Sequence, residues 1–248
     1  MNIRFDGKRA LVTGAGKGIG RDLAKKLVEC GAETYALSRT QSDLDSLQIE
    51  CPGIHAVQCD LSDCTALKAS VQSCGDIDLL VNNAAVALLE PFLEVKEEFF
   101  DKTFDINVKA PLMVSQIVAR GMVDRKNGGS IVNISSQAST IGIENHTSYC
   151  MSKAALDQLT RNMSLELGPH NIRVNAVNPT VVNTEMGKVG WSDPAKANPM
   201  KKMIPLGRFA EVEDVVSVIL FLLSDQAGMV TGSCLPIDGG CLGSLTIS

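Results

Sequence analysis

The chain has 248 residues, of which 45% are hydrophobic and 21% are charged, and its formal net charge is -5 at pH 7. This composition is typical of a globular protein with a sizeable core, and the acidic balance argues against a nucleic-acid-binding protein, which usually carries a basic surplus. The sequence shows no apolar run long enough to span a membrane and no signal peptide, so we expect a cytoplasmic protein.

Short apolar segments alternate with helical patterns along the chain. The predicted strands lie at residues 9–13, 34–38, 55–59, 77–81, 131–134, 172–177 and 234–237. The predicted helices lie at residues 18–30, 104–126, 149–167 and 211–224. Strands that alternate with helices predict an α/β fold, with a seven-stranded parallel sheet and helices on both faces. We therefore expect a single doubly wound, Rossmann-type domain over residues 1–248.

One long segment, residues 179–205, has no clear helix or strand pattern. It contains several prolines and the only tryptophan, Trp191. Because long loops inside a compact domain are usually functional, we interpret this segment as a substrate lid loop.

The eight cysteines do not predict a metal site. None of them forms a C-x-x-C pair, and the three histidines stand apart from them in the sequence. We expect free thiols and no metal, with Cys150 as the one thiol whose position suggests reactivity.

A glycine-rich turn, TGAGKGIG at residues 13–20, joins the first predicted strand to the first predicted helix. Its glycines let the backbone turn tightly, and they let a pyrophosphate approach the helix N-terminus, where free N–H groups favour anions. The strand before the turn and the helix after it provide the context that a dinucleotide-binding motif requires. We predict cofactor contacts from Gly14, Lys17, Gly18, Ile19 and Gly20.

The end of the second strand predicts which dinucleotide binds. A carboxylate at this place would hold the hydroxyls of the adenosine ribose, but the sequence has Arg39 and Thr40, with no acid before Asp43. The planar guanidinium of Arg39, together with Lys17, would match the oxygens of a 2′-phosphate. We therefore predict NADP(H) rather than NAD(H).

Ser136, Tyr149 and Lys153 form the candidate catalytic set. Tyr149 and Lys153 are four positions apart, so on a helix they share one face. A cation beneath a phenol lowers the pKa of the phenol towards neutral pH, and Ser136 could hold a substrate oxygen beside it. This arrangement suits proton transfer to or from a carbonyl or alcohol oxygen. The alternative is a surface helix on which a tyrosine and a lysine are one turn apart by chance.

Together with Asn107 and the segment NNAA at residues 82–85, these motifs resemble the short-chain dehydrogenase/reductase family over the whole chain. Within the family, the chain is most similar to the branch that reduces ketoses such as L-xylulose and α-dicarbonyls such as diacetyl. The segments that carry this likeness include VTGAGKGIGR, LLVNNAAVALLEPFLEV and ELGPHNIRVNAVNPTVV. The resemblance implies NADPH-dependent hydride transfer to a carbonyl carbon, with Tyr149 as the proton donor, in a homotetramer.

The resemblance also implies roles for further residues. Additional cofactor contacts are implied for Asp60, Leu61, Asn83, Val182 and Thr184. Lys153 would bind the nicotinamide ribose as well as act on Tyr149, and Asn107 would hold a water that contacts Lys153. Two positions depart from the commonest pattern of the family, because Ala85 and Thr180 stand where glycines are usual.

The candidate substrate contacts include several polar side chains. Besides Ser136 and Tyr149, they are Gln137, Ile143, His146 and Trp191. A site built to bond hydroxyls discriminates better than an apolar slot, so we expect a small sugar or other small carbonyl compound as the substrate. The alternatives are a 3-oxoacyl-thioester reductase, which would need basic residues grouped at the mouth of the site, and a non-catalytic nucleotide-sensing protein.

Overall fold

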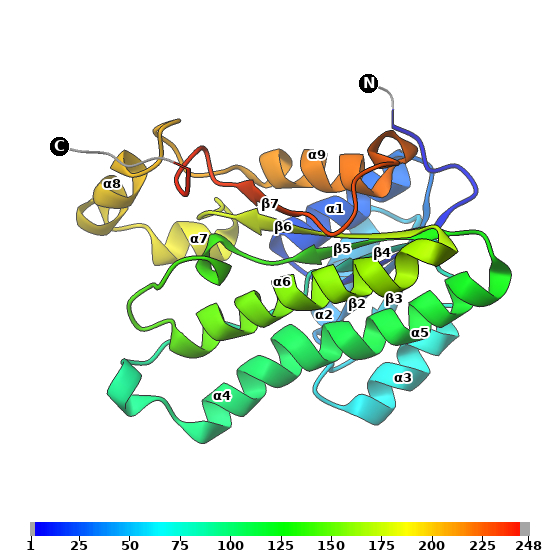
Figure 1. The fold of residues 1–248 in the computed structure, drawn as a ribbon, viewed down its shortest axis with the longest axis horizontal. Coiled ribbons are helices and arrows are strands. Elements are labelled where there is room, and N and C mark those ends of the chain that lie inside the picture. The colour runs from blue at the N-terminus through cyan, green and yellow to red at the C-terminus, as the bar shows by residue number, and fades with distance from the viewer. Residues whose placement is uncertain (1–2, 244–248) are drawn as a thin grey trace.

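Seven parallel strands form one sheet in the order β3-β2-β1-β4-β5-β6-β7 (Figure 1). The strands are β1 (Arg9–Thr13), β2 (Glu33–Ser38), β3 (Ile54–Gln58), β4 (Leu79–Asn82), β5 (Gly129–Ile134), β6 (Ile172–Pro179) and β7 (Cys234–Ile237). The chain begins in the middle of the sheet and winds outward in both directions, so its crossovers place helices on both faces. The predicted seven-stranded parallel sheet and single Rossmann-like domain are confirmed.

This computed structural model describes residues 3–243, so the ends of the predicted domain, residues 1–2 and 244–248, lie outside the described residues. No helix among the described residues is both long enough and apolar enough to cross a membrane.

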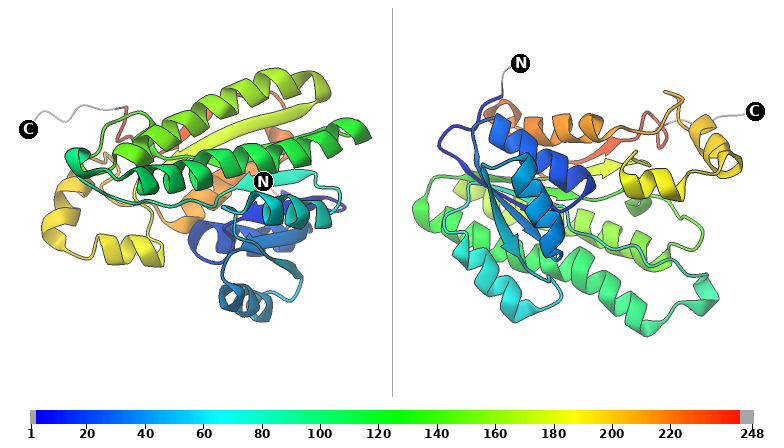
Figure 2. Two further views of the ribbon diagram at one scale, coloured as in Figure 1. Left: turned by 90° about the horizontal axis from the view of Figure 1, so that it is seen from below. Right: turned by 180° about the vertical axis from the view of Figure 1, so that it is seen from behind.

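The helices cover the two faces of the sheet in separate groups (Figures 1 and 2). One face carries α1 (Gly18–Glu29), α2 (Gln41–Glu50) and α9 (Val212–Leu223). The other face carries α3 (Cys64–Ser73), α5 (Ala110–Arg125) and α6 (Thr147–Leu167). Each group packs over its own apolar core, because successive residues of a strand point to opposite faces. Within β1, for example, Val12 belongs to the first core and Leu11 to the second.

The region predicted as one helix at residues 104–126 consists of three elements. The helix α4 (Glu97–Phe104) runs into a π-helical segment at Asp105–Lys109, and α5 follows at once. A π-helical turn is wider than an α-helical one and is frequent at functional sites. Asn107 lies inside this segment.

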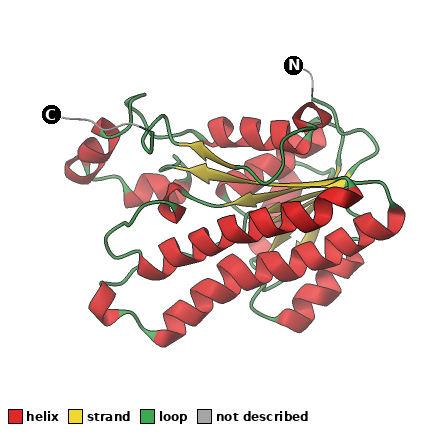
Figure 3. Cartoon of the chain, in the orientation of Figure 1, coloured by secondary structure: helices red, strands yellow, loops and turns green. Residues whose placement is uncertain are grey.

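The segment 179–205 contains two helices, α7 (Glu185–Gly190) and α8 (Pro194–Lys202), so its prediction as an irregular loop is wrong (Figure 3). Both helices begin with a side-chain cap that the sequence analysis did not use. The Thr184 hydroxyl accepts the N–H of Gly187 at 3.0 Å, and the Asp193 carboxylate accepts the N–H of Ala195 at 2.9 Å. Such caps satisfy N–H groups at the helix start and stabilise helices that have little apolar periodicity.

Candidate active site

The predicted site residues follow the carboxyl ends of the parallel strands. In an open α/β sheet, this edge is where ligands bind, at the point where the strand order reverses. The reversal lies between β1 and β4, whose following turns contain Gly14 and Asn83. The helices α7 and α8 lie at the same end of the sheet (Figure 1).

The turn after β1 is locked against the turn after β4. The Asn83 Nδ2 atom donates to the carbonyl oxygens of Thr13 and Gly14, both at 3.0 Å, and the Thr13 hydroxyl accepts the N–H of Asn83 at 3.0 Å. Gly14 has a φ of +65°, and a Cβ atom there would lie 2.7 Å from Cα of Ala84. Only glycine fits this position without moving the backbone.

The N-terminus of α1 is open. Lys17 occupies the N-cap position without a side-chain cap, and no acidic residue lies in the first turn. The φ of Gly18 is +56°, and a Cβ atom there would lie 3.2 Å from the Thr184 side chain, so the segment after β6 approaches this helix end. Uncapped N–H groups at a helix start bind phosphate, so this cradle fits the pyrophosphate of a dinucleotide.

The end of β2 presents an unpaired positive charge. Arg39 is exposed, and among residues 3–243 its guanidinium has no ion-pair partner. Thr40 is exposed beside it, and Asp43, the first acid after β2, has its Oδ1 atom 3.5 Å from Nζ of Lys17. This carboxylate is therefore engaged by Lys17, while Arg39 remains available for an anion.

The remaining implied cofactor residues are held by local contacts. The Asp60 carboxylate accepts the N–H and the hydroxyl of Ser62 at 2.9 and 2.8 Å, and these hydrogen bonds lower the pKa of Asp60. Leu61 is buried in the core beneath α3 and α5. Val182 forms a parallel β-bridge with Ala210 and packs against the other core.

The structure brings Ser136, Tyr149 and Lys153 together. Ser136 follows β5, and its hydroxyl accepts the N–H of Ala138 at 3.1 Å. Tyr149 and Lys153 lie on successive turns near the start of α6, and the Ser136 side chain lies close enough to the Tyr149 phenol to affect its pKa. Lys153 is only 2% exposed and donates to the carbonyl oxygen of Ile134 at 2.8 Å.

The electrostatics of the phenol differ from the sequence-based expectation. Burial raises the pKa of Tyr149, and the hydrogen bond with Ser136 opposes this rise. Burial also lowers the pKa of Lys153 to about 8, while the charge of Asp157 acts in the opposite direction. The net pKa of Tyr149 is therefore raised rather than lowered as expected, because burial of the phenol outweighs the influences that favour the phenolate. At neutral pH the phenol is protonated, as a proton donor must be.

Asn107 is completely buried and joins three parts of the site. Its Oδ1 atom accepts the N–H of Val86 at 2.8 Å, while Nδ2 donates to the Val86 carbonyl at 2.9 Å and to the Ser152 hydroxyl at 3.0 Å. Ser152 in turn donates to the carbonyl oxygen of Tyr149 at 2.8 Å. The Asn107 side chain thus anchors the loop after β4 to the helix that carries Tyr149 and Lys153.

The candidate substrate residues divide into two groups. Gln137 is 5% exposed, and its Oε1 atom is buried without a partner among the described residues. The His146 ring lies edge-on to Tyr149, with 6.2 Å between centroids, and Ile143 is half-buried nearby in the chain. Trp191 instead packs against Phe209, with ring centroids 5.5 Å apart. Its ring contacts do not include the candidate catalytic set.

Two buried polar residues escaped the sequence analysis. Asp157 lies one helical turn beyond Lys153, and Asn178 lies near the end of β6, next to Ser136. The i,i+4 spacing of Lys153 and Asp157 was a usable signal, but an acid on a helix is more often exposed than buried.

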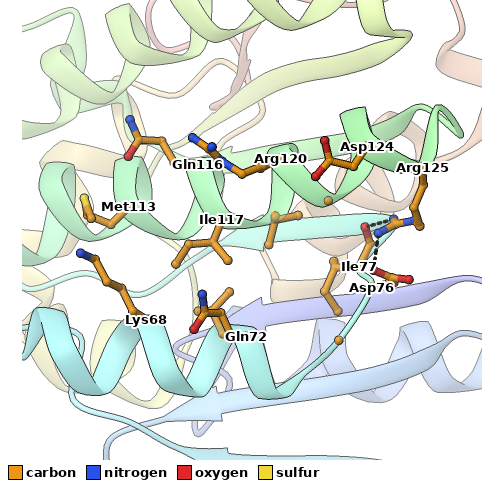
Figure 4. Close-up of a pocket in the computed structure, with 14 residues that line it drawn as sticks. Lys68, Gln72, Asp76, Ile77, Met113, Gln116, Ile117, Arg120, Asp124 and Arg125 are labelled. Atoms are coloured by element: carbon orange, nitrogen blue, oxygen red, sulfur yellow. Dashed lines mark hydrogen bonds and ion pairs between the residues drawn. The ribbon is translucent and has the colours of Figure 1, made fainter.

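A groove elsewhere on the surface does not contain the candidate site. It lies between α3 and α5, and Figure 4 shows Lys68, Met113, Ile117 and Arg120 along it. At its end, Arg125 pairs with Asp76, with 2.8 Å between Nη1 and Oδ1.

Comparisons with known proteins agree with this geometry. A family profile described as "Enoyl-(Acyl carrier protein) reductase" matches residues 14–241. L-xylulose reductase of Bos taurus is 60% identical over 98% of this chain and 99% of its own length, and D-erythrulose reductase of Gallus gallus is 57% identical over 97% and 98%. The crystal structure of a gluconate 5-dehydrogenase from Burkholderia cenocepacia J2315 in complex with NADP and tartrate has a TM-score of 0.92 at 28% identity, and the match covers 98% of each chain.

Proposed function

Because the chain belongs to the short-chain dehydrogenase/reductase family and is an oxidoreductase that reduces a small carbonyl compound, we propose a specific reaction for it. The proposed substrate is a small polar ketose or α-dicarbonyl, with reduction of L-xylulose to xylitol as the leading case and NADPH as the reductant. The observation that carries the proposal is the position of the buried Lys153 ammonium, 5.6 Å from the centroid of the Tyr149 ring, beside Ser136 at the carboxyl edge of the sheet.

The residues around the first turn fit a nicotinamide dinucleotide phosphate. The uncapped start of α1 would hold the pyrophosphate, and Gly14 and Gly18 leave the room that a Cβ atom would fill. Arg39, which has no ion-pair partner among the described residues, would hold the 2′-phosphate. When bound, NADPH supplies the hydride that reduces the carbonyl carbon.

Ser136 and Tyr149 perform the acid catalysis. The Ser136 hydroxyl orients the carbonyl oxygen of the substrate, and the Tyr149 phenol donates a proton to that oxygen as it gains negative charge. The raised pKa of Tyr149 keeps the proton in place at neutral pH, so the enzyme starts each reduction with the donor loaded. The Lys153 ammonium stabilises the phenolate that remains.

Asn107 holds neighbouring segments of the site in place rather than binding a water through its side-chain amide. Its Nδ2 atom donates to the Val86 carbonyl and to the Ser152 hydroxyl, so neither amide hydrogen is available to a water. A proton route from Lys153 to solvent would therefore use the backbone of the π-helical segment, which departs from regular α-helical pairing.

The substrate assignment rests on the polar groups near Ser136 and on the relatives. The unpaired Oε1 atom of Gln137 can accept a hydrogen bond from a substrate hydroxyl, and the His146 ring lies beside Tyr149. Two relatives are named for L-xylulose and for D-erythrulose, and both of these compounds are small ketoses. A hydroxylated ketose would satisfy buried polar atoms that an acyl chain would leave unpaired.

Residues 179–205, which contain α7 and α8, act as the lid in this proposal. Their position at the carboxyl edge suits closure over a bound substrate (Figure 2). Trp191 belongs to this segment and packs on Phe209. Its role in the proposal is to hold the lid in place, not to contact the substrate.

The proposed enzyme is a cytoplasmic homotetramer, by analogy with its family. The exposed side chains of Met151 and Leu165 on α6 and of Leu235 on β7 would be covered by neighbouring subunits. Sedimentation velocity tests this assignment directly.

A substrate panel tests the proposed function. Initial rates of NADPH oxidation are measured with L-xylulose, diacetyl and an acetoacetyl thioester, and then repeated with NADH. We expect the highest kcat/KM for L-xylulose or diacetyl with NADPH. A higher kcat/KM for the thioester would assign the chain to the 3-oxoacyl-thioester reductases instead.

A further inference from the structure

We propose that Asp157 and Asn178 are positioning residues for the reaction, which join the charge on α6 to the backbone of Ser136. The inference rests on the proposed function, because it takes Ser136, Tyr149 and Lys153 as the reacting set.

Asp157 is a buried carboxylate with an incomplete set of partners. It is 3% exposed and lies four residues after Lys153, on the same face of α6. Its Oδ2 atom accepts from Nδ2 of Asn178 at 2.9 Å, while its Oδ1 atom has no partner among the described residues. A buried carboxylate is costly unless charges or hydrogen bonds compensate it. The compensation comes from the buried ammonium of Lys153, one turn earlier on the same helix face. The two groups form no direct ion pair, because Lys153 donates to the carbonyl oxygen of Ile134, so the negative charge of Asp157 raises the pKa of Lys153 through space.

Asn178 connects this carboxylate to the turn that holds Ser136. Its Nδ2 atom lies 2.8 Å from the Ser139 hydroxyl, 2.9 Å from Oδ2 of Asp157 and 3.2 Å from the carbonyl oxygen of Ser136. These acceptors belong to α6 and to the turn after β5, while Asn178 itself belongs to β6. One amide therefore ties together three segments, two of which carry the candidate catalytic residues.

The other titratable groups around Asp157 do not replace Lys153 as its counter-charge. Arg161 lies one turn further along α6, but it is exposed and hydrogen-bonded to Gln158 at 3.3 Å. Cys234 on β7 places its sulfur 3.9 Å from the Asp157 carbonyl oxygen, and burial raises the pKa of this thiol to about 11. Among the described residues, Asp157 is the one charged group that acts appreciably on Lys153.

The consequence is that the charge of Lys153 depends on Asp157. Without the carboxylate, burial alone acts on the ammonium, so its pKa falls further. The alkaline limb of the kcat profile, where Lys153 loses its proton, then moves to lower pH. A residue that only filled space would not move this limb.

The test is the pH dependence of kcat in the full-length Asp157→Asn variant at saturating NADPH and L-xylulose. The amide keeps the shape and can still accept from Asn178, but it removes the charge. We expect the alkaline limb to move to lower pH by about one unit. Asp157→Glu restores the charge and returns the limb towards that of the wild type. A folded Asp157→Asn variant whose profile superimposes on the wild type overturns the proposal.

A matched control separates local from global effects of charge. Asp78→Asn removes another partly buried carboxylate and changes the net charge by the same amount, but Asp78 lies at the opposite end of the sheet and pairs with Arg125. We expect this variant to lose thermal stability while its pH profile stays that of the wild type. An equal shift of the limb in Asp78→Asn would overturn the assignment to Asp157.

Asn178→Ala tests the second half of the pair. Loss of the amide frees the Ser136 backbone, so we expect kcat at neutral pH to fall about tenfold or more with unchanged affinity for NADPH. If Asp157→Asn does not fold, Asn178→Ala still tests the proposal. A folded Asn178→Ala variant with the kcat of the wild type would overturn it. Tyr149→Phe is measured beside it, because residual full activity there would refute the proposed function rather than this inference.

Discussion

The ammonium of Lys153 lies 5.6 Å from the centroid of the Tyr149 ring and donates its 2.8 Å hydrogen bond to the carbonyl oxygen of Ile134. The positive charge therefore faces the ring of the phenol. Burial of the phenol keeps Tyr149 protonated at neutral pH, and the nearby ammonium provides a charge that stabilises the phenolate after proton transfer. The free phenol is thus in the protonation state from which it can donate a proton to a carbonyl oxygen.

The rate of reduction should fall as the pH rises through about 8. The pKa of Lys153 is lowered to about 8 by burial, so the ammonium is charged below this pH and neutral above it. Tyr149 stays protonated throughout this range, because its pKa is raised. We expect kcat to be constant near neutral pH and to decrease above about pH 8, in stopped assays at saturating substrate and cofactor. A profile that stays flat to about pH 10 would contradict this role of Lys153.

Replacement of Lys153 by methionine should inactivate the protein and destabilise it at neutral pH. The folded-state pKa of Lys153 lies below its ordinary value, so burial of the charge has a cost below about pH 8 that the methionine relieves. The methionine also leaves the Asp157 carboxylate buried without this positive charge and the carbonyl oxygen of Ile134 without its donor, and loss of one of two buried charges outweighs the relief. We expect the free energy of unfolding of Lys153→Met at pH 7 to fall by about 2 kcal/mol or more in urea titrations. Lys109→Met, on an exposed lysine, is the control and should change little. Unchanged or increased stability of Lys153→Met would contradict the coupling between Lys153 and Asp157.

Arg39 should determine the choice of cofactor. Arg39→Asp replaces the unpaired guanidinium by a carboxylate that repels a 2′-phosphate and can accept ribose hydroxyls. We expect kcat/KM for NADPH to fall by about 100-fold or more, and the preference to move towards NADH. Arg120→Asp makes the same charge change on the exposed face of α5 and should leave both values unaltered. Indifference of the NADPH kinetics to Arg39→Asp would refute the 2′-phosphate site.

The tight approach of the turns after β1 and β4 should make Gly14 irreplaceable. In Gly14→Ala the new methyl group would meet Cα of Ala84 at 2.7 Å, at a backbone φ of +65°. We expect a loss of about 1–3 kcal/mol in stability and weaker NADPH binding, measured by thermal unfolding and by fluorescence titration. Gly142→Ala is the matched control, because a Cβ atom there has no neighbour within 4 Å. Equal stability of the two variants would contradict the described packing.

The sheet could be predicted from the sequence because its signals are local. Each strand is a short apolar run between glycines or polar turns, and the strand predicted at 234–237 is the observed β7 (Cys234–Ile237). The helices α2 and α3 were missed, because each has only 10 residues and buries only two side chains. The helices α7 and α8 were missed because their caps, rather than apolar faces, mark where they begin.

The candidate site was predictable where spacing fixes geometry. Tyr149 and Lys153 share a helix face in any α-helix, so their proximity follows from the sequence. The direction of the pKa change at Tyr149 was not predictable, because it depends on how deeply the folded chain buries the phenol. The hydrogen-bond partners of Asn178 could not be predicted from the sequence either. They come together only when β6, α6 and the turn after β5 pack against one another.

The most direct test is the rate of L-xylulose reduction by Tyr149→Phe, measured as NADPH oxidation beside a titration of NADPH binding. The phenylalanine keeps the ring and removes the proton that the substrate oxygen must receive. We predict that kcat falls by at least about 100-fold while the affinity for NADPH stays within about twofold of the wild type. Turnover near the wild-type rate in a variant that still binds NADPH would contradict the account.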